Sequence, residues 1–171
     1  DGMAKEGNPY VGILYGGLMI KDGAIKVLEF NCRFGDPECQ PIVIRLKSDL
    51  VDILEAAIDG KLDEITLEWD ERATVCVVMA SGGYPGSYPK GIEIKGLKDA
   101  AALKDVVVFH AGTKLEGDKV LTNGGRVLGV TSLGDTVSEA ISRAYEAVEL
   151  ITWEGAQYRT DIGKKALQRE R

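Results

Sequence analysis

The chain has 171 residues, a formal net charge of −6, and 44% hydrophobic and 28% charged residues. Nucleic-acid binding draws on clustered Lys and Arg, so this charge argues against a nucleic-acid partner. No apolar stretch approaches the ~18 residues that a membrane span needs. We therefore expect a soluble globular protein that binds neither nucleic acid nor a membrane.

The N-terminus and the cysteines indicate the cellular setting. The chain begins with Asp1 and lacks the apolar run of a secretory signal, so we expect a fragment of a longer protein. Cys32, Cys39 and Cys76 show no C-x-x-C spacing, and His110 is the single histidine, so a zinc site is not expected. The thiols indicate a reduced, cytoplasmic protein.

The first half of the chain predicts a β-hairpin followed by two helices. Residues 11–20 and 24–31 form two extended runs around a Lys-Asp-Gly turn. Asp36 is a plausible helix N-cap and Pro37 suits the first helical position, which predicts a helix through about residue 46. A second helix, capped at 48–49, should end at Gly60. Its apolar residues recur at helical spacing: Leu50, Ile53, Leu54, Ala57 and Ile58.

The second half predicts a mostly antiparallel α+β domain. A polar stretch precedes the β-type run 73–80, and we place the domain boundary there, giving domains 1–71 and 72–171. Thr136 and Glu139 have the spacing of a capping box ahead of a long helix that runs to about residue 151. Short strands are expected at 92–95, 106–110, 120–122 and 126–132, with a small helix near 99–103.

Two polar residues on the second hairpin strand predict a metal site. Glu29 and Asn31 are two positions apart, so their side chains leave the same face of the strand. A carboxylate beside a carboxamide suits Mg²⁺, which takes its other ligands from water and nucleotide phosphates. By itself the pair is weak evidence, because an exposed pair without a chemical role has the same pattern.

The residues that follow carry a specific resemblance. The run LEFNCRFGDPECQ, residues 28–40, resembles the signature of the glycinamide ribonucleotide synthetase family of the ATP-grasp superfamily. The resemblance covers nearly the whole chain and includes PYVGILYGGLM, KSDL, VMASGGYPG, FHAGT, TNGGRVL and YRTDIG. It implies the C-terminal part of an ATP-grasp domain, made of the hairpin plus helices, followed by a small α+β domain.

The resemblance also implies an activity. In this family ATP phosphorylates the carboxylate of glycine, and the amine of 5-phosphoribosylamine then attacks the acyl phosphate. The products are glycinamide ribonucleotide, ADP and phosphate. The implied cofactor is Mg²⁺ or Mn²⁺, with ATP as co-substrate, and the metal ligands are Glu29 and Asn31. Many ATP-grasp relatives supply a further acidic ligand from the preceding strand, whereas residues 15–18 contain none.

Four further residues are candidates for catalysis or substrate binding. Arg33 could hold the transferring phosphoryl group as the catalytic cation, or could pair with Asp36 or Glu38. Asp36 could bind the ammonium group of glycine or act only as a helix cap. Arg126 and Arg159 could reach the ribose phosphate, although a tight turn explains the glycines beside Arg126 equally well.

A complete synthetase also needs an N-terminal domain, a glycine-rich lid and an adenine-binding strand, none of which we find in these residues. We therefore expect the isolated fragment to be inactive and to work with the N-terminal part of its own chain. Two alternatives remain open. One is a non-catalytic binding or assembly module, and the other is an ATP-grasp ligase with a different acceptor.

Overall fold

The computed structural model describes residues 2–168, which form two compact units. The first unit holds the chain up to Cys39 and Leu46–Asp70, and the second holds Gln40–Arg45 and the chain from Glu71 onward. Both units mix helices with antiparallel strands, which confirms the coarse fold class. The domain boundary at 71/72 stays a prediction.

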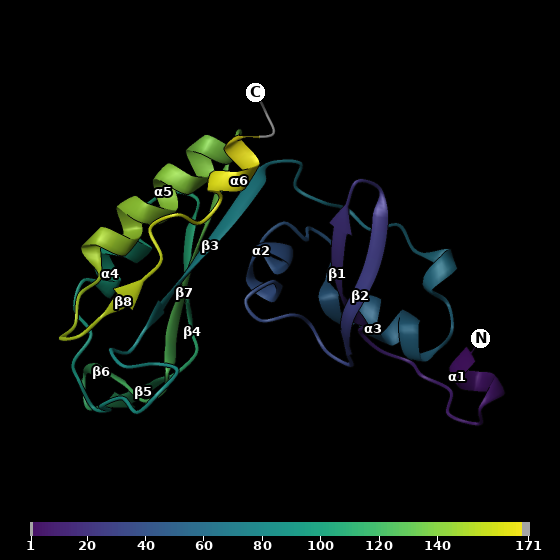
Figure 1. Cartoon of the computed structure of the whole chain (residues 1–171), viewed down its shortest axis with the longest axis horizontal. Coiled ribbons are helices and arrows are strands. Elements are labelled where there is room, and N and C mark those ends of the chain that lie inside the picture. The colour runs from purple at the N-terminus through teal and green to yellow at the C-terminus, as the bar shows by residue number, and fades with distance from the viewer. Residues whose placement is uncertain (1, 169–171) are drawn as a thin grey trace. The chain divides into compact units, whose positions relative to one another are not determined.

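The first unit is built on a two-stranded antiparallel hairpin (Figure 1). Asp22 and Gly23 form its turn with φ values of 51° and 78°, the left-handed pair that suits a two-residue hairpin loop. The first strand begins four residues later than predicted, and a register shift lies between Gly17 and Leu18. The elements of this unit are α1 (Gly2–Lys5), β1 (Tyr15–Lys21), β2 (Ala24–Asn31), α3 (Leu50–Ile58) and a 3₁₀ turn, η1 (Leu62–Glu64).

The hairpin carries apolar side chains that the described part of the unit leaves uncovered. Only Gly17 and Gly35 are buried among the described residues of this unit. Seven large apolar side chains on β1 and β2 are 48–65% exposed: Leu18, Met19, Ile20, Ile25, Val27, Leu28 and Phe30. The first unit as described therefore has no closed hydrophobic core.

The helices around the hairpin differ in how well the sequence predicted them. In α3, Asp49 caps the helix by accepting a hydrogen bond of 2.8 Å from the Val51 N–H, as expected. The helix predicted from Pro37 to about 46 is wrong in its bounds, because α2 spans Cys39–Val43. Residues 36–38 form a turn with a cis Asp36–Pro37 peptide bond, so neither residue caps or starts this helix.

The second unit contains a four-stranded antiparallel sheet in the order β4-β7-β3-β8. Helices α4 and α5 pack on one face of it (Figure 1). The predicted strand at 92–95 is wrong, because Glu93 and Lys95 form only isolated bridges, and β5 and β8 were not predicted. The elements are β3 (Ala73–Ala80), α4 (Leu97–Ala101), β4 (Val106–His110), β5 (Thr113–Glu116), β6 (Lys119–Thr122), β7 (Arg126–Gly134), α5 (Val137–Leu150), β8 (Gln157–Tyr158) and α6 (Lys164–Leu167).

The core of the second unit lies between this sheet and α5. Val77, Met79 and Val130 are fully buried, and each such side chain contributes about 1.5–3 kcal/mol relative to an exposed one. Helix α5 presents small alanines at helical spacing, which lets it approach the sheet closely. Thr136 caps this helix by accepting a hydrogen bond of 3.1 Å from the Glu139 N–H, which confirms the predicted N-cap. The Glu139 carboxylate accepts from the Asp135 N–H at 3.0 Å, one residue before the position that a capping box requires.

The segment Gln40–Arg45, which we call the strap, packs on the sheet of the second unit. The Thr74 hydroxyl donates to the Pro41 carbonyl at 3.3 Å. A Cβ atom at Gly129 would lie 3.3 Å from Cys76 Sγ and 3.5 Å from Gln40 Nε2, so this glycine makes room for the Gln40 side chain. The strap, which begins at the last residue of the signature motif, is therefore part of the second unit.

Two general features complete the fold. All three cysteines are free thiols, and only Cys76 is buried. Among residues 2–168, no helix is both long and apolar enough to cross a membrane.

Two arginines converge on Asp105 in the second unit. Arg72 Nη1 lies 2.9 Å from Asp105 Oδ1, and Arg143 Nη1 lies 3.2 Å from Oδ2. Arg143 also donates to the Leu133 carbonyl at 2.8 Å. The hydrogen bond from Arg72 is the main cause that lowers the pKa of Asp105, and the charges of both arginines act in the same direction. Asp105, in the loop before β4, therefore ties the residue that precedes β3 to α5.

We expect Asp105→Asn to lower the free energy of unfolding at pH 7 by roughly 1–3 kcal/mol, because charged hydrogen bonds are lost. Asn suits the left-handed φ of 61° at this position, so backbone strain should not contribute. Because folding lowers the pKa of Asp105, its contribution is present above the unfolded pKa of ~3.9 and is lost as the pH falls through the folded value. Denaturant titrations should show the wild-type advantage shrinking below about pH 4. A constant difference down to pH 2 would contradict the ion-pair explanation.

Candidate functional site

The candidate metal residues lie on one face of the hairpin, near the end where β2 leaves it. Glu29 pairs with Gly17 and Asn31 pairs with Tyr15 across the two strands. A Cβ atom at Gly17 would lie 3.0 Å from Glu29 Cγ, so the Glu29 side chain lies over this glycine. The strand thus presents the carboxylate and the carboxamide on the same side, next to the Tyr15 ring.

Tyr15 is the common neighbour of the charged side chains at this end of the hairpin. Its hydroxyl donates a hydrogen bond to Glu38 Oε1 at 3.2 Å. The charge of Glu38 is the main cause that raises the pKa of Tyr15, with a smaller contribution from Glu29, while the charge of Arg33 lowers it. The ring therefore lies within electrostatic reach of three residues of the strand and the signature motif.

Glycines set the position of the Tyr15 ring. A Cβ atom at Gly17 would lie 3.6 Å from Tyr15 Cε1, and one at Gly35 would lie 2.8 Å from Cε2, on the other edge of the ring. A Cβ atom at Gly35 would also collide with Glu38 Oε2. The Tyr15 ring and the Glu38 carboxylate thus occupy space that only glycine at position 35 leaves open.

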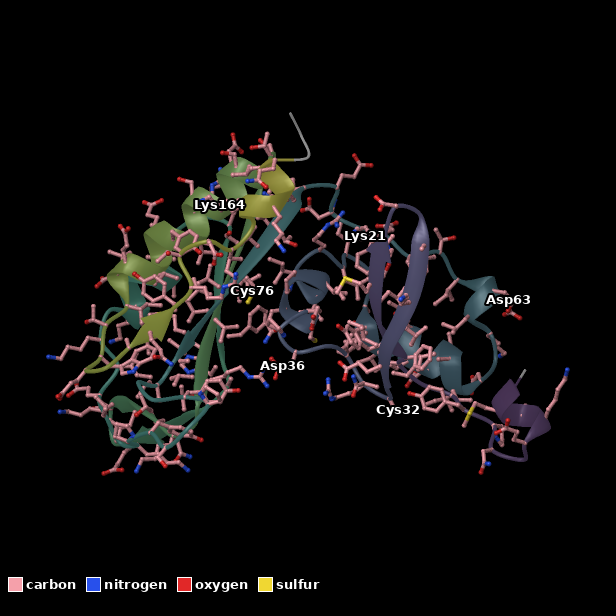
Figure 2. The ribbon with its side chains drawn as sticks, viewed as in Figure 1. Lys21, Cys32, Asp36, Asp63, Cys76 and Lys164 are labelled. Carbon is pink, nitrogen blue, oxygen red and sulfur yellow. The ribbon has the colours of Figure 1, made fainter. Side chains whose placement is uncertain are left out.

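The two remaining candidates of the motif lie in the chain that leaves β2. Arg33 donates from Nη1 to the Phe34 carbonyl at 2.8 Å, and the hydrogen bond to Glu38 comes from Tyr15. Asp36 lies in the turn before α2. Figure 2 labels Lys21 at the turn end of the hairpin, and Cys32 and Asp36 in the chain beyond its other end.

The donor set fits a magnesium ion that shares its coordination with phosphates. Within the described chain, no group of three or more His, Cys, Asp or Glu side chains could hold a metal ion. Mg²⁺ needs only one or two protein oxygens when substrate phosphates and water complete its octahedron. Glu29 is exposed and Asn31 is half-buried, so both can be reached. The residues fit the metal, although their assignment as ligands stays a prediction.

The arginines predicted to bind the ribose phosphate lie in the second unit. Arg126 begins β7 and pairs with Ala80 of β3, and β8 follows on the far side of β3. Arg159 comes directly after β8 and holds Asp161 with two hydrogen bonds of 2.9 and 2.8 Å. It lines a surface hollow of about 540 Å³ together with Lys164 and Lys165. The role of Arg126 and Arg159 in substrate binding stays a prediction.

Sequence reasoning missed Tyr15, Glu38 and Gly35. Residues 15–18 were considered only for the acidic ligand that they lack. The two-residue turn by itself would place Tyr15 opposite Phe30, and the register shift between Gly17 and Leu18, which no sequence signal indicated, places it opposite Asn31 instead. The contact between Tyr15 and Glu38 joins residues 23 positions apart through a turn, and periodicity does not predict such a contact.

Two family models match the chain. Residues 74–165, more than half of the chain, match the phosphoribosylglycinamide synthetase C domain. Residues 1–39 match the ATP-grasp (A) domain of phosphoribosylglycinamide synthetase. The hairpin and most of the signature motif lie within the second match.

Similar proteins and structures agree with these matches. The chain is 62% identical to a phosphoribosylamine–glycine ligase of Salmonella typhimurium and 58% identical to one of Pseudomonas aeruginosa. Each alignment covers 99% of this chain and 40% of the relative, so the chain spans about two fifths of the length of these curated relatives.

Solved structures show the same relation. A phosphoribosylamine–glycine ligase from Thermotoga maritima matches with a TM-score of 0.78 and 38% identity, over 94% of this chain and 39% of that one. An N5-carboxyaminoimidazole ribonucleotide synthetase from the same organism matches with a TM-score of 0.56 at 17% identity, over 84% of this chain and 37% of that one, which shows similarity of fold alone.

Proposed function

Because the chain belongs to the phosphoribosylglycinamide synthetase family, we propose that it is the C-terminal part of a ligase that joins glycine to 5-phosphoribosylamine while ATP is cleaved to ADP and phosphate. The observation that carries this proposal is the face of the hairpin that presents Glu29 and Asn31 at the start of the Arg33–Glu38 motif. The match of residues 1–39 to the ATP-grasp domain of the family includes this motif.

The first unit contributes the C-terminal portion of an ATP-grasp domain. The match of residues 1–39 to the ATP-grasp domain supports this assignment. The uncovered apolar residues of β1 and β2 support a partner, which we identify as the N-terminal part of the same ligase chain. That part would supply the lid and the adenine-binding strand.

In the proposed reaction, the chain's own residues bind and orient the reacting groups. Glu29 and Asn31 would hold Mg²⁺, which when bound neutralises charge on the nucleotide phosphates. Arg33 can turn its guanidinium from the Phe34 carbonyl to the phosphoryl group and hold two of its oxygens. That contact stabilises negative charge while the glycine carboxylate becomes an acyl phosphate.

The other candidates would bind the substrates away from the phosphoryl group. Asp36 would accept hydrogen bonds from the ammonium group of glycine. Arg126 and Arg159 would hold the ribose phosphate of 5-phosphoribosylamine. For Arg159 this requires that a phosphate compete with Asp161, whose charge and hydrogen bonds raise the pKa of Arg159 and keep its cation in place. Binding of the phosphate by Arg159 would therefore have to break its two hydrogen bonds to Asp161.

The test is the reaction itself, measured on the full-length ligase that contains these 171 residues. We expect ADP release that requires glycine and 5-phosphoribosylamine together, and a product whose mass is that of glycinamide ribonucleotide. Release of ADP with another amine in place of 5-phosphoribosylamine would show that the acceptor is wrongly assigned. Absence of ADP release with every acceptor would favour a binding or assembly module.

A further inference from the structure

We propose that Glu38, held in place by Tyr15, is the carboxylate that receives the amino group of a substrate. This inference rests on the proposed ligase function and adds Tyr15 and Glu38 to the residues that it uses. It starts from the hydrogen bond of 3.2 Å between the Tyr15 hydroxyl and Glu38 Oε1.

The Glu38 carboxylate is fixed but still able to accept hydrogen bonds. Its Oε1 takes the Tyr15 proton, and its Oε2 lies against Gly35. An ionised carboxylate has about four lone-pair sites, of which the tyrosine uses one. The Glu38 side chain is exposed, so the remaining sites can be reached from solvent. A carboxylate that is held in one orientation and still has open acceptor sites is suited to bind a cationic donor.

The Tyr15 ring separates this carboxylate from the candidate metal ligands. One ring edge lies toward Gly17, which Glu29 covers, and the opposite edge lies toward Gly35 and the Glu38 carboxylate. Glu29 and Glu38 are not part of any metal-binding group of three acidic or sulfur side chains within residues 2–168. The two carboxylates therefore lie toward opposite edges of the Tyr15 ring.

The substrates of the proposed reaction indicate which chemical group the Glu38 carboxylate would bind. Glycine brings an ammonium group, and 5-phosphoribosylamine brings an amine. Either group donates hydrogen bonds to a carboxylate, and an ammonium group does so with the added strength of a charged pair. Tyr15 is then a positioning residue, because it acts on the substrate only through Glu38.

The first experiment measures KM separately for glycine, 5-phosphoribosylamine and Mg-ATP in the full-length ligase. We expect Glu38→Gln to raise KM for one amine substrate about tenfold, with KM for Mg-ATP changing less than about twofold. Tyr15→Phe keeps the ring and should raise the same KM by a smaller factor. The substrate whose KM rises identifies the amine that Glu38 binds.

A double mutant tests whether Tyr15 acts through Glu38. Tyr15→Phe combined with Glu38→Gln should be no worse than Glu38→Gln alone, because the tyrosine then has no carboxylate to position. Multiplication of the two single effects would overturn the positioning role.

Two glycine variants form a matched pair on either side of the ring. Gly35→Ala places a methyl group against Glu38 and Tyr15, and should raise KM for the amine substrate. Gly17→Ala places its methyl group against Glu29, 3.0 Å from Cγ, and should instead raise the Mg²⁺ concentration needed for half-maximal rate. Thermal melts by circular dichroism establish that each variant is folded. If Gly35→Ala instead raised the Mg²⁺ requirement and left KM for the amine unchanged, Glu38 would act on the metal and the inference would be overturned.

Calorimetric binding of glycine distinguishes this inference from the proposed function. If the wild-type ligase forms no product but binds glycine more tightly than Glu38→Gln does, the inference stands and the function fails. If the wild type forms product and Glu38→Gln leaves KM for both amines unchanged, the inference fails and the function stands. Equal binding of glycine and equal binding of 5-phosphoribosylamine by the wild type and by Glu38→Gln, without any turnover, overturns both.

Discussion

Glu29→Gln in the full-length ligase is expected to lower turnover at least about a hundredfold without unfolding the protein. Glu29 is the only carboxylate on β2, and its side chain lies over Gly17 on the face that also carries Asn31. Glutamine has nearly the same shape but no charge, so it should hold Mg²⁺ much more weakly. Steady-state rates measured across a Mg²⁺ titration provide the measurement.

Two further variants control this result. Asn31→Ala should act in the same direction but more weakly, since a neutral ligand contributes less to holding the cation. Glu55→Gln, an exposed acid on α3, removes the same charge from the same unit and should leave turnover unchanged. Full activity of Glu29→Gln at limiting Mg²⁺ would remove the metal assignment. A thermal melt establishes that the variant is folded.

Amide hydrogen exchange in the isolated 171-residue chain is expected to be much slower in the second unit than in the first. Amides of β3 and β7 should exchange at least about a thousandfold more slowly than amides of β1 and β2. The reason is burial. Val77 and Val130 are fully buried, whereas each of the large apolar side chains on β1 and β2 is 48–65% exposed. Mass spectrometry of peptides from each unit measures this difference.

The same chain should not bind Mg-ATP. Calorimetric titration at millimolar nucleotide should give no detectable heat, because under the proposed function the first unit supplies only one wall of the nucleotide site. A cooperative thermal melt in the same buffer, expected from the core of the second unit, would show that the chain has folded. Micromolar nucleotide binding would show that the adenine site lies within these residues, and equal protection of both units would show that the hairpin is stable without its partner.

The sequence predicts the elements that have strong local signals. The N-cap at Thr136 and the alanine spacing identify α5, and the run at 73–80 identifies β3 at its observed bounds. Glu29 and Asn31 share a face because strand geometry alone requires it. These features depend on residues that are close together in the chain.

Other features depend on tertiary contacts that no local pattern reveals. β8 has only two residues and exists because Tyr158 and Gln157 pair with the end of β3. α2 begins two residues later than predicted, because the turn at Asp36 and Pro37 takes the place of a helix start. The hydrogen bond between Tyr15 and Glu38 likewise depends on how this turn returns the chain to β1.

The strap has a consequence for dividing the protein into separate pieces. The chain passes from the first unit to the second at Cys39, returns at Leu46, and passes over again at Glu71. A polypeptide cut at Glu71 would therefore lack the residues that fill the space beside Gly129 and bond Thr74. Independent expression of the second unit would have to restore Gln40–Arg45, for example by circular permutation that joins this segment to the opposite end of the unit. The two units are interleaved in sequence.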